Sequence, residues 1–294
     1  WTQGSTMKAV EQRLSVGGKG LDSSVALHHL GTRTKAVTFL AGRTGKDLEQ
    51  LIKTQYGFQL LPFWVPGETR TAHIISELQD GVHSHIFSGG ILPSPQDERD
   101  MLEDLDRHLD QTLFMITGGI LPQSASMDLH ARIIERAHAA GVPALIDAHS
   151  QWMLAALPST PAVVKLNIHE FCTTFKQNCA SISDLIPAAN ATRAEYHLKN
   201  LVITCGPDGI IALTEQGDFH AQPPRLNAVN AAGAGDAASA ALAWQLSETS
   251  DWPNALRWAA AVSGAVVLTP GTADCHQTDV DRRLPQINIL EAKT

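Results

Sequence analysis

Residues 229–244 read VNAAGAGDAASAALAW, so two glycines and an aspartate lead directly into an alanine-rich run. The alanines favour a helix. Small residues such as Gly233 and Gly235 let a backbone approach an anion closely, and a helix start offers it unpaired N–H groups. Asp236 stands where a general base would lie beside a bound phosphate. A glycine turn with an N-capping aspartate explains the same residues, so the functional interpretation needs support from elsewhere in the chain.

Composition limits the class of protein. The chain has 294 residues, 44% of them hydrophobic, and a formal net charge of −8. This is enough apolar material for a large core, and the acidic balance argues against a broad nucleic-acid or membrane surface. The four cysteines form no CxxC pair, which fits a reducing compartment. With no apolar run of membrane-spanning length, we expect a cytoplasmic protein.

The amino-terminal third predicts one small sheet and the first strand–helix unit. Residues 17–20 (GGKG) form a glycine turn, in which Lys19 adds a cation. Alternating residues predict three strands of a small separate sheet, at 6–16, 72–78 and 82–88, the last two joined by a turn at 79–81. Helical spacing or a buried apolar run predicts helices at 21–30 and 46–56 and a strand at 35–40.

From Ser94 onward, strand and helix patterns alternate, which is typical of a mainly parallel α/β sheet. Helices are predicted at 96–109, 127–141, 237–244 and 252–269. Strands are predicted at 112–119, 143–147 and 162–171, followed by two strands around a Gly-Pro-Asp-Gly turn at 206–209. One of these strands ends at Asp147, and the strand at 162–171 has polar residues at its carboxyl end, where open α/β sheets bind ligands.

Four motifs in this order resemble those of the ribokinase-like carbohydrate kinases, the PfkB family. They are GGKGLDSSVALHHLG at 17–31, KLNIHE at 165–170, ITCGPDG at 203–209 and NAAGAGDA at 230–237. The resemblance covers nearly the whole chain and implies a three-layer α/β/α fold, with a mostly parallel central sheet and a small β-sheet lid. It divides the chain into an α/β core (17–67 and 89–294) and a β lid (1–16 and 68–88).

The resemblance also implies roles for individual residues. Asp236 would be the catalytic base, and the anion hole would consist of Gly233, Ala234 and Gly235. Asn167 and Glu170 would organise Mg²⁺ through water. Nucleotide binding would fall to Lys165, Asn167, Thr204, Gly206 and Gly209, and sugar binding to Gly18, Lys19, Gly20 and Asp22. The implied cofactors are ATP and Mg²⁺, with a monovalent cation as a further candidate.

GETR at 67–70 resembles the branch that phosphorylates ketohexose phosphates, such as fructose 1-phosphate or tagatose 6-phosphate. In that branch the arginine matching Arg70 reaches the phosphate already on the substrate, and a guanidinium fork suits a phosphate. A salt bridge at the base of the hairpin is the alternative role for Arg70. The expected partners are therefore a sugar phosphate and ATP, with a homodimer formed through the lid as a further expectation.

Some positions depart from the family pattern. Asp22 replaces the usual Asn of GGKGxN, and Ile120 stands where the branch usually has a serine that contacts the phosphate. The resemblance implies a further first strand, with a sugar-binding Asp, whose position would lie upstream of Trp1. These departures keep two alternatives open: a kinase of an unphosphorylated sugar or nucleoside, and a catalytically silent protein that binds sugar phosphate or nucleotide. A Rossmann dehydrogenase fits poorly, because no GxGxxG follows the first strand.

Overall fold

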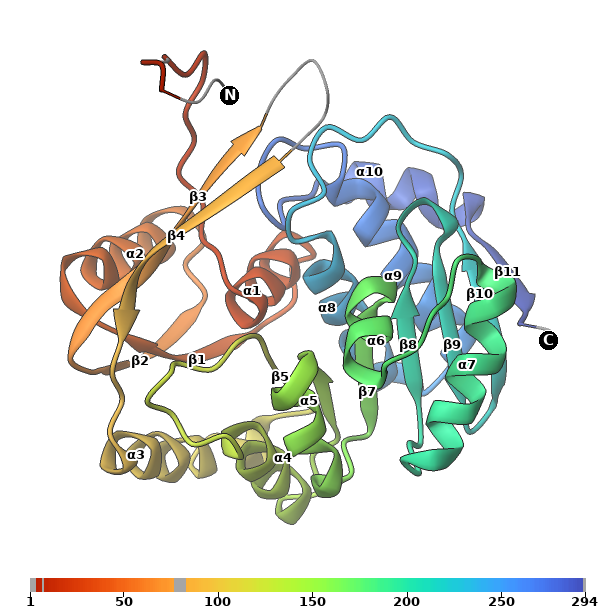
Figure 1. Ribbon diagram of the computed structural model, residues 1–294, viewed down its shortest axis with the longest axis horizontal. Helices are drawn as coiled ribbons and strands as arrows, with labels where there is room; N and C mark the ends of the chain where they lie inside the picture. The colour runs from red at the N-terminus through yellow and green to blue at the C-terminus, as the bar shows by residue number, and fades with distance from the viewer. Residues whose placement is uncertain (1–3, 7, 77–82, 293–294) are drawn as a thin grey trace.

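The computed structural model describes residues 4–6, 8–76 and 83–292. The central sheet has the order β11-β10-β9-β8-β7-β6-β5. Its strands are β5 (Met115–Gly118), β6 (Ala144–Asp147), β7 (Val163–Asn167), β8 (Leu201–Thr204), β9 (Ile210–Thr214), β10 (Gly217–Gln222) and β11 (Asn288–Glu291). Strands β5 to β8 pair in parallel, and β9 to β11 continue the sheet antiparallel. Figure 1 shows this sheet in the right half of the molecule.

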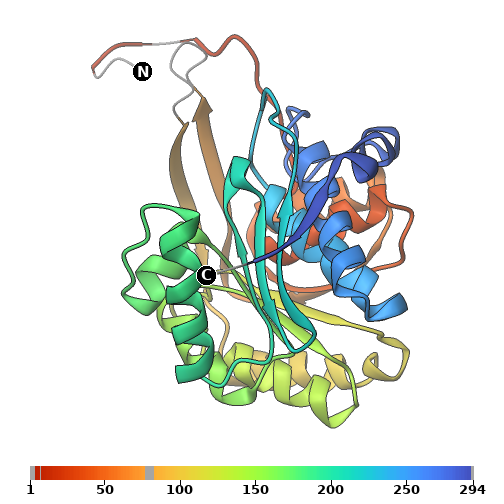
Figure 2. The same ribbon diagram turned by 90° about the vertical axis from the view of Figure 1, so that its right-hand side faces the viewer.

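Helices cover both faces of the sheet, which confirms the predicted α/β/α layering (Figure 2). Successive strand residues point to opposite faces, so Leu145 packs with α1, α8 and α9, whereas Ile146 packs with α4 to α7. The helices are α1 (Lys19–His29), α2 (Gly42–Gln55), α3 (Pro95–Asp106), α4 (Leu129–Ala139), α5 (Ser150–Ala156), α6 (Ile168–Phe175), α7 (Ile182–Glu195), α8 (Ala234–Thr249), α9 (Trp252–Val266) and α10 (Gln277–Arg283). Within the described ranges, none of them is long and apolar enough to span a membrane.

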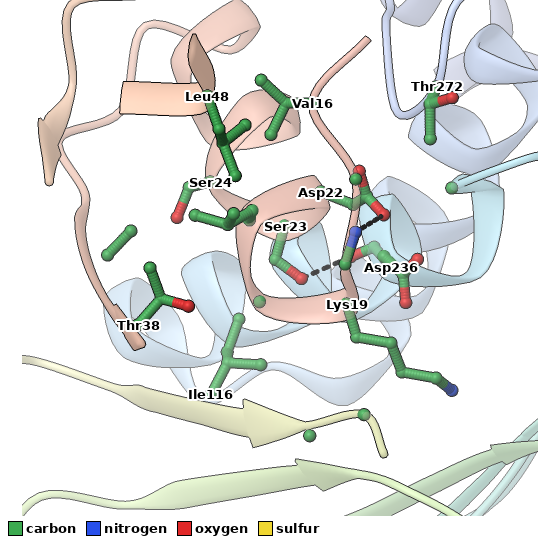
Figure 3. Close-up of a pocket in the computed structure, with 18 of the residues that line it drawn as sticks. Val16, Lys19, Asp22, Ser23, Ser24, Thr38, Leu48, Ile116, Asp236 and Thr272 are labelled. Atoms are coloured by element: carbon green, nitrogen blue, oxygen red, sulfur yellow. Dashed lines mark hydrogen bonds between the residues drawn. The ribbon is translucent and has the colours of Figure 1, made fainter. Parts of the chain in front are cut away.

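A second, two-stranded parallel sheet lies beside the central one. It pairs β1 (Lys35–Leu40) with β2 (Gln59–Trp64), a strand that the sequence patterns had not predicted. Among the described residues, no strand joins β1 to β5. A cavity of about 3370 Å³ is lined instead by residues of β1, β5 and α1, including Thr38, Ile116 and Ser24 (Figure 3).

The lid is the antiparallel hairpin of β3 (Gly67–Ser76) and β4 (His83–Ile91), which projects from the body (Figure 1). The predicted turn at 79–81 lies outside the described residues. The GETR motif anchors the base of this hairpin: the Glu68 carboxylate accepts from Thr44 N at 2.5 Å, and Thr69 Oγ1 accepts from Ala41 N at 2.8 Å. Both bonds satisfy N–H groups at the start of α2, so two residues of the motif act as helix caps.

The strand predicted at residues 6–16 is wrong. Residues 8–16 have no strand conformation, and Val10 and Leu14 are 93% and 74% exposed. An alternating pattern makes a strand only where a partner edge accepts its backbone hydrogen bonds, and the described residues of β3 and β4 bond to each other instead.

Several boundaries also differ from the prediction. The strand predicted over 162–171 ends at Asn167, because Asn167 and Glu170 form a capping box that starts α6. Helix α2 starts at Gly42, four residues before the predicted start, since the lid base supplies its caps. Helix α1 starts at Lys19, so the expected glycine turn becomes the first turn of a helix.

Candidate active site

The glycine turn before α8 is locked against the loop at residues 270–273. Gly233 has φ 77°, and a Cβ there would lie 2.4 Å from Ala273 N, so a side chain cannot be accommodated. Asn230 Oδ1 accepts from Ala232 N, and Asn230 Nδ2 donates to the carbonyls of Pro270 and Gly271. The predicted anion-hole residues Gly233, Ala234 and Gly235 thus begin α8 in a fixed turn, and Gly233 lines the cavity together with Asp236.

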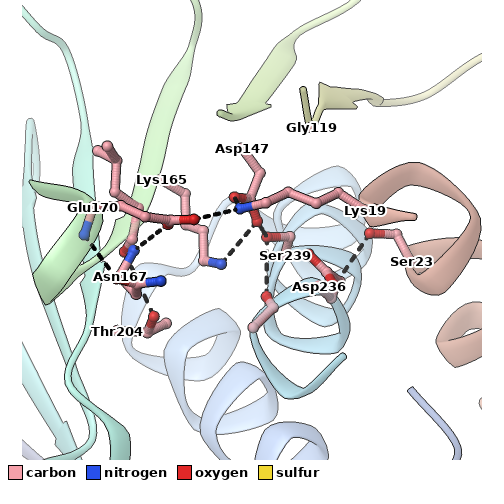
Figure 4. A network of polar contacts seen from close by, with 12 residues as sticks. Lys19, Ser23, Gly119, Asp147, Lys165, Asn167, Glu170, Thr204, Asp236 and Ser239 are labelled. Carbon is pink, nitrogen blue, oxygen red and sulfur yellow. Dashed lines mark hydrogen bonds and ion pairs between the residues drawn. The ribbon is translucent and has the colours of Figure 1, made fainter. Parts of the chain in front are cut away.

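A network of polar and charged side chains joins five elements of the core next to this turn (Figure 4). Asp147, at the end of β6, accepts from Lys19 Nζ at 2.5 Å, Lys165 Nζ at 2.7 Å and Ser239 Oγ at 2.7 Å. Lys19 also donates to Glu170 Oε1 at 3.0 Å. The network therefore brings Lys19, a predicted sugar-binding residue, and Lys165, a predicted nucleotide-binding residue, to one buried carboxylate.

Asp147 and Ser239 were given no role by the sequence motifs. The signal for Asp147 was its position at the carboxyl end of a buried strand, and the signal for Ser239 was its spacing of three residues from Asp236 on one helix. Burial alone would raise the pKa of Asp147, but Lys165 and Lys19 outweigh it and lower that pKa to about 2. Asp147 is thus ionised and fully paired.

Lys19 shows the complementary effect. Burial alone would lower the pKa of its ammonium group, but the carboxylates of Asp147 and Glu170, with Asp236 further away, raise it above its usual value. Lys19 therefore keeps its positive charge, and its side chain lines the cavity.

Asp236 behaves differently from Asp147. Burial raises the pKa of Asp236 to about 6, the negative charge of Asp147 adds to this rise, and Lys165 and Lys19 oppose it. A carboxylate with a pKa near neutrality, lining a cavity, suits a general base, because it can take a proton and later release it.

The motif residues on the nucleotide side lie at the ends of β7 and β8. Asn167 Oδ1 accepts from Glu170 N at 2.8 Å, and Glu170 Oε2 accepts from Asn167 N at 2.9 Å. Thr204 Oγ1 lies 3.5 Å from the Leu166 carbonyl, at the end of the neighbouring strand. Asn167 and Thr204 are paired in the register of β7 and β8, so the three residues lie side by side at this edge of the sheet.

The two glycines of the GPDG turn differ in their surroundings. A Cβ on Gly206 would meet no atom within 4 Å, so its surface is open for a ligand. A Cβ on Gly209 would lie 2.0 Å from the Ala221 carbonyl, so Gly209 is needed for close packing against β10. Packing therefore explains Gly209 without a nucleotide.

The sugar-side residues surround the first turn of α1. Gly18 has φ 113°, and its N–H donates to Asp22 Oδ2 at 3.0 Å. Gly18, Lys19, Gly20 and Asp22 all line the cavity between β1 and β5. Arg70 lines the same cavity, with its guanidinium 4.9 Å from the centre of the Phe87 ring. The described residues offer no ion pair to Arg70, so a cation–π contact takes the place of the alternative salt bridge.

His130 is a further residue that the motifs missed. Its Nδ1 lies 2.8 Å from Thr117 Oγ1, and its Nε2 lies 3.3 Å from the Gly119 carbonyl. Burial lowers the pKa of His130, so the ring is neutral and can accept from the threonine while donating to the carbonyl. These bonds hold the loop at residues 118–120 beside Lys19.

The sequence of this chain matches a known protein family. The model of the pfkB family carbohydrate kinases matches residues 2–279. The chain belongs to the pfkB family of carbohydrate kinases. It is therefore an ATP-dependent sugar kinase, which confirms the prediction of an enzyme and disfavours a catalytically silent binding protein.

Individual relatives support the same family. A 1-phosphofructokinase of Vibrio cholerae is 29% identical over 289 residues, covering 98% of this chain and 90% of the relative. A tagatose-6-phosphate kinase of Staphylococcus epidermidis is 25% identical, covering 94% and 89%. The structure of Escherichia coli phosphofructokinase-2 in complex with potassium has a TM-score of 0.82 at 21% identity, covering 95% and 92%, and supports the fold of this kinase.

Proposed function

We propose that this kinase transfers the γ-phosphoryl group of ATP to a primary hydroxyl of a ketohexose phosphate, such as fructose 1-phosphate or tagatose 6-phosphate. The observation that carries the proposal is the position of Asp236: half-buried, with a pKa of about 6, at the start of α8 and beside Lys19 and Lys165. Phosphoryl transfer depends mainly on positioning and charge stabilisation, and this cluster can supply both.

In this proposal Asp236 takes the proton of the acceptor hydroxyl as the hydroxyl attacks. The N–H groups of the first turn of α8, from Gly233 to Gly235, stabilise the transferring group. Lys165 reinforces that site, since its Nζ would lie 3.0 Å from a Cβ on Gly235. Asp147 touches neither reactant here and positions the two lysines.

Asn167 and Glu170 offer the oxygen atoms that Mg²⁺ prefers. The capping box and Lys19 already engage these oxygens. No group of three His, Cys, Asp or Glu residues in the described ranges is placed to hold a metal. The pair therefore fits an ion that is held through water and through the ATP phosphates, and that would neutralise phosphate charge.

Arg70 is proposed to bind the phosphate already on the acceptor. It lines the cavity from the lid, and its contact with one face of Phe87 leaves a planar guanidinium that suits a phosphate. We expect Arg70→Met to raise KM for the sugar phosphate about 10- to 100-fold with little change in KM for ATP. Arg282→Met, on exposed α10, is the matched control. An unchanged sugar-phosphate KM would remove Arg70 from the site.

A second candidate is phosphorylation of an unphosphorylated sugar or nucleoside. It is favoured by Ile120, which is 47% exposed beside Gly119 and offers no donor to a phosphate, and by the buried carboxyl group of Asp22. Steady-state assays of ADP release with fructose 1-phosphate, tagatose 6-phosphate, fructose and ribose separate the candidates. The first predicts a kcat/KM at least about 100-fold higher for the phosphorylated acceptors. The reverse order would establish the second.

Two further proposals concern partners. The lid hairpin exposes Ile74, Ile86 and Phe87 at 42%, 48% and 56%, an apolar surface that suits a homodimer formed through the lid. Sedimentation of the wild type and of Ile86→Glu tests this, and a dimer unaffected by the substitution would place the interface elsewhere.

A requirement for a monovalent cation is a separate proposal. It is tested by replacing potassium with choline in the assay buffer.

A further inference from the structure

Two aspartates from different helices line the cavity, and Asp22 is buried whereas Asp236 is half-buried. Asp22 belongs to the first turns of α1 and is 5% exposed, and Asp236 belongs to the first turn of α8. Figure 3 shows them next to each other on adjoining helices. The two side chains repel each other enough that the negative charge of Asp236 raises the pKa of Asp22. Such a pair raises the question of which carboxyl group carries a proton.

The helices hold this pair rigidly. Ser23 Oγ donates to the Asp236 carbonyl at 3.0 Å, which ties the residue after Asp22 directly to Asp236. Behind this bond, Ala26 of α1 and Ala237 of α8 are completely buried in the same hydrophobic cluster. Because small residues let the helices pack closely, the two carboxyl groups cannot move apart without breaking the core.

Asp22 has little to stabilise a negative charge. Its Oδ2 accepts from Gly18 N at 3.0 Å, whereas its Oδ1 is buried and has no hydrogen-bond partner among the described residues. A buried carboxylate with one oxygen unsatisfied is costly, whereas a protonated carboxyl group has a hydroxyl that can donate. Burial, and then the charge of Asp236, therefore raise the pKa of Asp22 well above its usual value.

The charges around the two aspartates differ. Lys19 and Lys165 favour the ionised form of Asp236, against burial and the negative charges of Asp147 and Glu170. Asp22 faces Asp236, the Gly18 N–H group and Tyr56, whose own pKa is raised by burial, by Asp274 and by Asp22. The negative charge of the pair therefore belongs on Asp236, and the proton belongs on Asp22.

We propose that Asp22 and Asp236 share one proton at neutral pH, which Asp22 holds, so that Asp22 is a neutral hydrogen-bond donor beside the catalytic base. This inference rests on the proposed role of Asp236. The neutral carboxyl group donates into the cavity, to an oxygen of the acceptor near the reacting hydroxyl. When Asp22 ionises, a second negative charge forms next to Asp236 and next to the incoming phosphoryl group, and it opposes the transfer.

Infrared difference spectroscopy of the protein alone tests the proton sharing without relying on any substrate. We expect a protonated-carboxyl band at neutral pH in the wild type and in the surface control Asp47→Asn, and its loss in Asp22→Asn. In Asp236→Asn the band should persist but titrate at lower pH, because one source of the upward pKa shift is gone. A wild-type protein without the band at neutral pH would overturn the proposal.

The pH dependence of kcat/KM tests the catalytic consequence, with each profile scaled to its own maximum. The kcat/KM of the wild type should fall about tenfold per pH unit on the alkaline side of its optimum, where Asp22 ionises. Asp22→Asn keeps a neutral donor and should lose that alkaline limb while keeping the acid limb due to Asp236. An unchanged alkaline limb in Asp22→Asn would overturn the role of Asp22. If no acceptor were phosphorylated at all, the proposed function would fail, and the infrared result would still decide the proton sharing.

Discussion

The end of β6 and the start of α8 each place an aspartate next to the same charged cluster, Asp147 buried and Asp236 half-buried, yet the two residues have opposite properties. Asp147 receives direct hydrogen bonds from two lysines and a serine, and its pKa falls to about 2. Among the described residues no lysine lies within ion-pair distance of Asp236, and burial raises its pKa to about 6. Lys19 and Lys165 act on both carboxyl groups, but only Asp147 has them as direct partners.

The difference between Asp147 and Asp236 is that between a charge that stabilises the fold and a charge that can react. A carboxylate that is completely paired stabilises its surroundings and is a poor base, because its proton affinity is low. A carboxylate that is incompletely paired costs stability but can accept a proton. The region at β6 therefore holds the lysines in place, and the region at α8 is free to react. Four experiments test this division.

The largest expected effect is the loss of activity when Asp236, at the start of α8, is replaced. Asp236→Asn should lower kcat by about 10³-fold, because the amide cannot accept the hydroxyl proton. Its melting temperature should not fall, since the substitution removes a charge that burial disfavours. Steady-state kinetics and thermal unfolding measure the two effects. Turnover of Asp236→Asn at the wild-type rate would contradict the assignment of Asp236 as the base.

At the β6 region the expected effect is on stability. Asp147→Asn leaves buried Lys165, 2% exposed, without its direct carboxylate partner, which should cost about 3 kcal/mol of unfolding free energy. Urea unfolding measures this loss. The control Asp47→Asn removes an exposed carboxylate 3.8 Å from Arg43 and should change stability by less than about 0.5 kcal/mol. Equal effects in both variants would contradict the structural role of Asp147.

The pH dependence should differ between activity and folding. Asp236 must be ionised to act, so kcat/KM should fall about tenfold per pH unit below a pH of about 6. Asp147 has a folded-state pKa below its unfolded value, so its stabilisation is complete above the unfolded pKa and is lost only as pH falls toward about 2. Circular dichroism and initial rates, recorded over the same pH range, should therefore show inactivation well before unfolding. Coincident transitions would mean that unfolding causes the loss of activity.

The smallest expected effect concerns the serine that supports Asp147. Ser239→Ala removes the hydrogen bond to Asp147 Oδ2 and should cost about 1 kcal/mol of unfolding free energy, with a small rise in the pKa of Asp147. Ser247→Ala, in the same helix, removes only a bond to the Trp244 carbonyl and serves as the control. If both variants lost the same unfolding free energy, the bond from Ser239 to Asp147 would stabilise the fold no more than the control bond does.

Most element types and their order were predictable from the sequence, because they depend on local patterns. The strand at Lys35–Leu40 and the alternation from residue 94 onward are confirmed. The failures have long-range causes. Residues 8–16 alternate like a strand but pair with no edge in the part of the chain that the structure describes, and α2 begins at Gly42 because Glu68 and Thr69 cap it from the lid.

For the candidate site, the sequence determined which residue types lie at strand ends and helix starts, including Gly233, Asp236, Asn167 and Glu170. Periodicity and glycine positions encode those placements locally. Only the tertiary structure decided that residues 19, 147, 165, 170 and 239 meet in one network, and that Asp147 and Asp236 differ in proton affinity. The pKa of a buried group depends on charges and burial contributed by distant parts of the chain, and these exist only after the chain has folded.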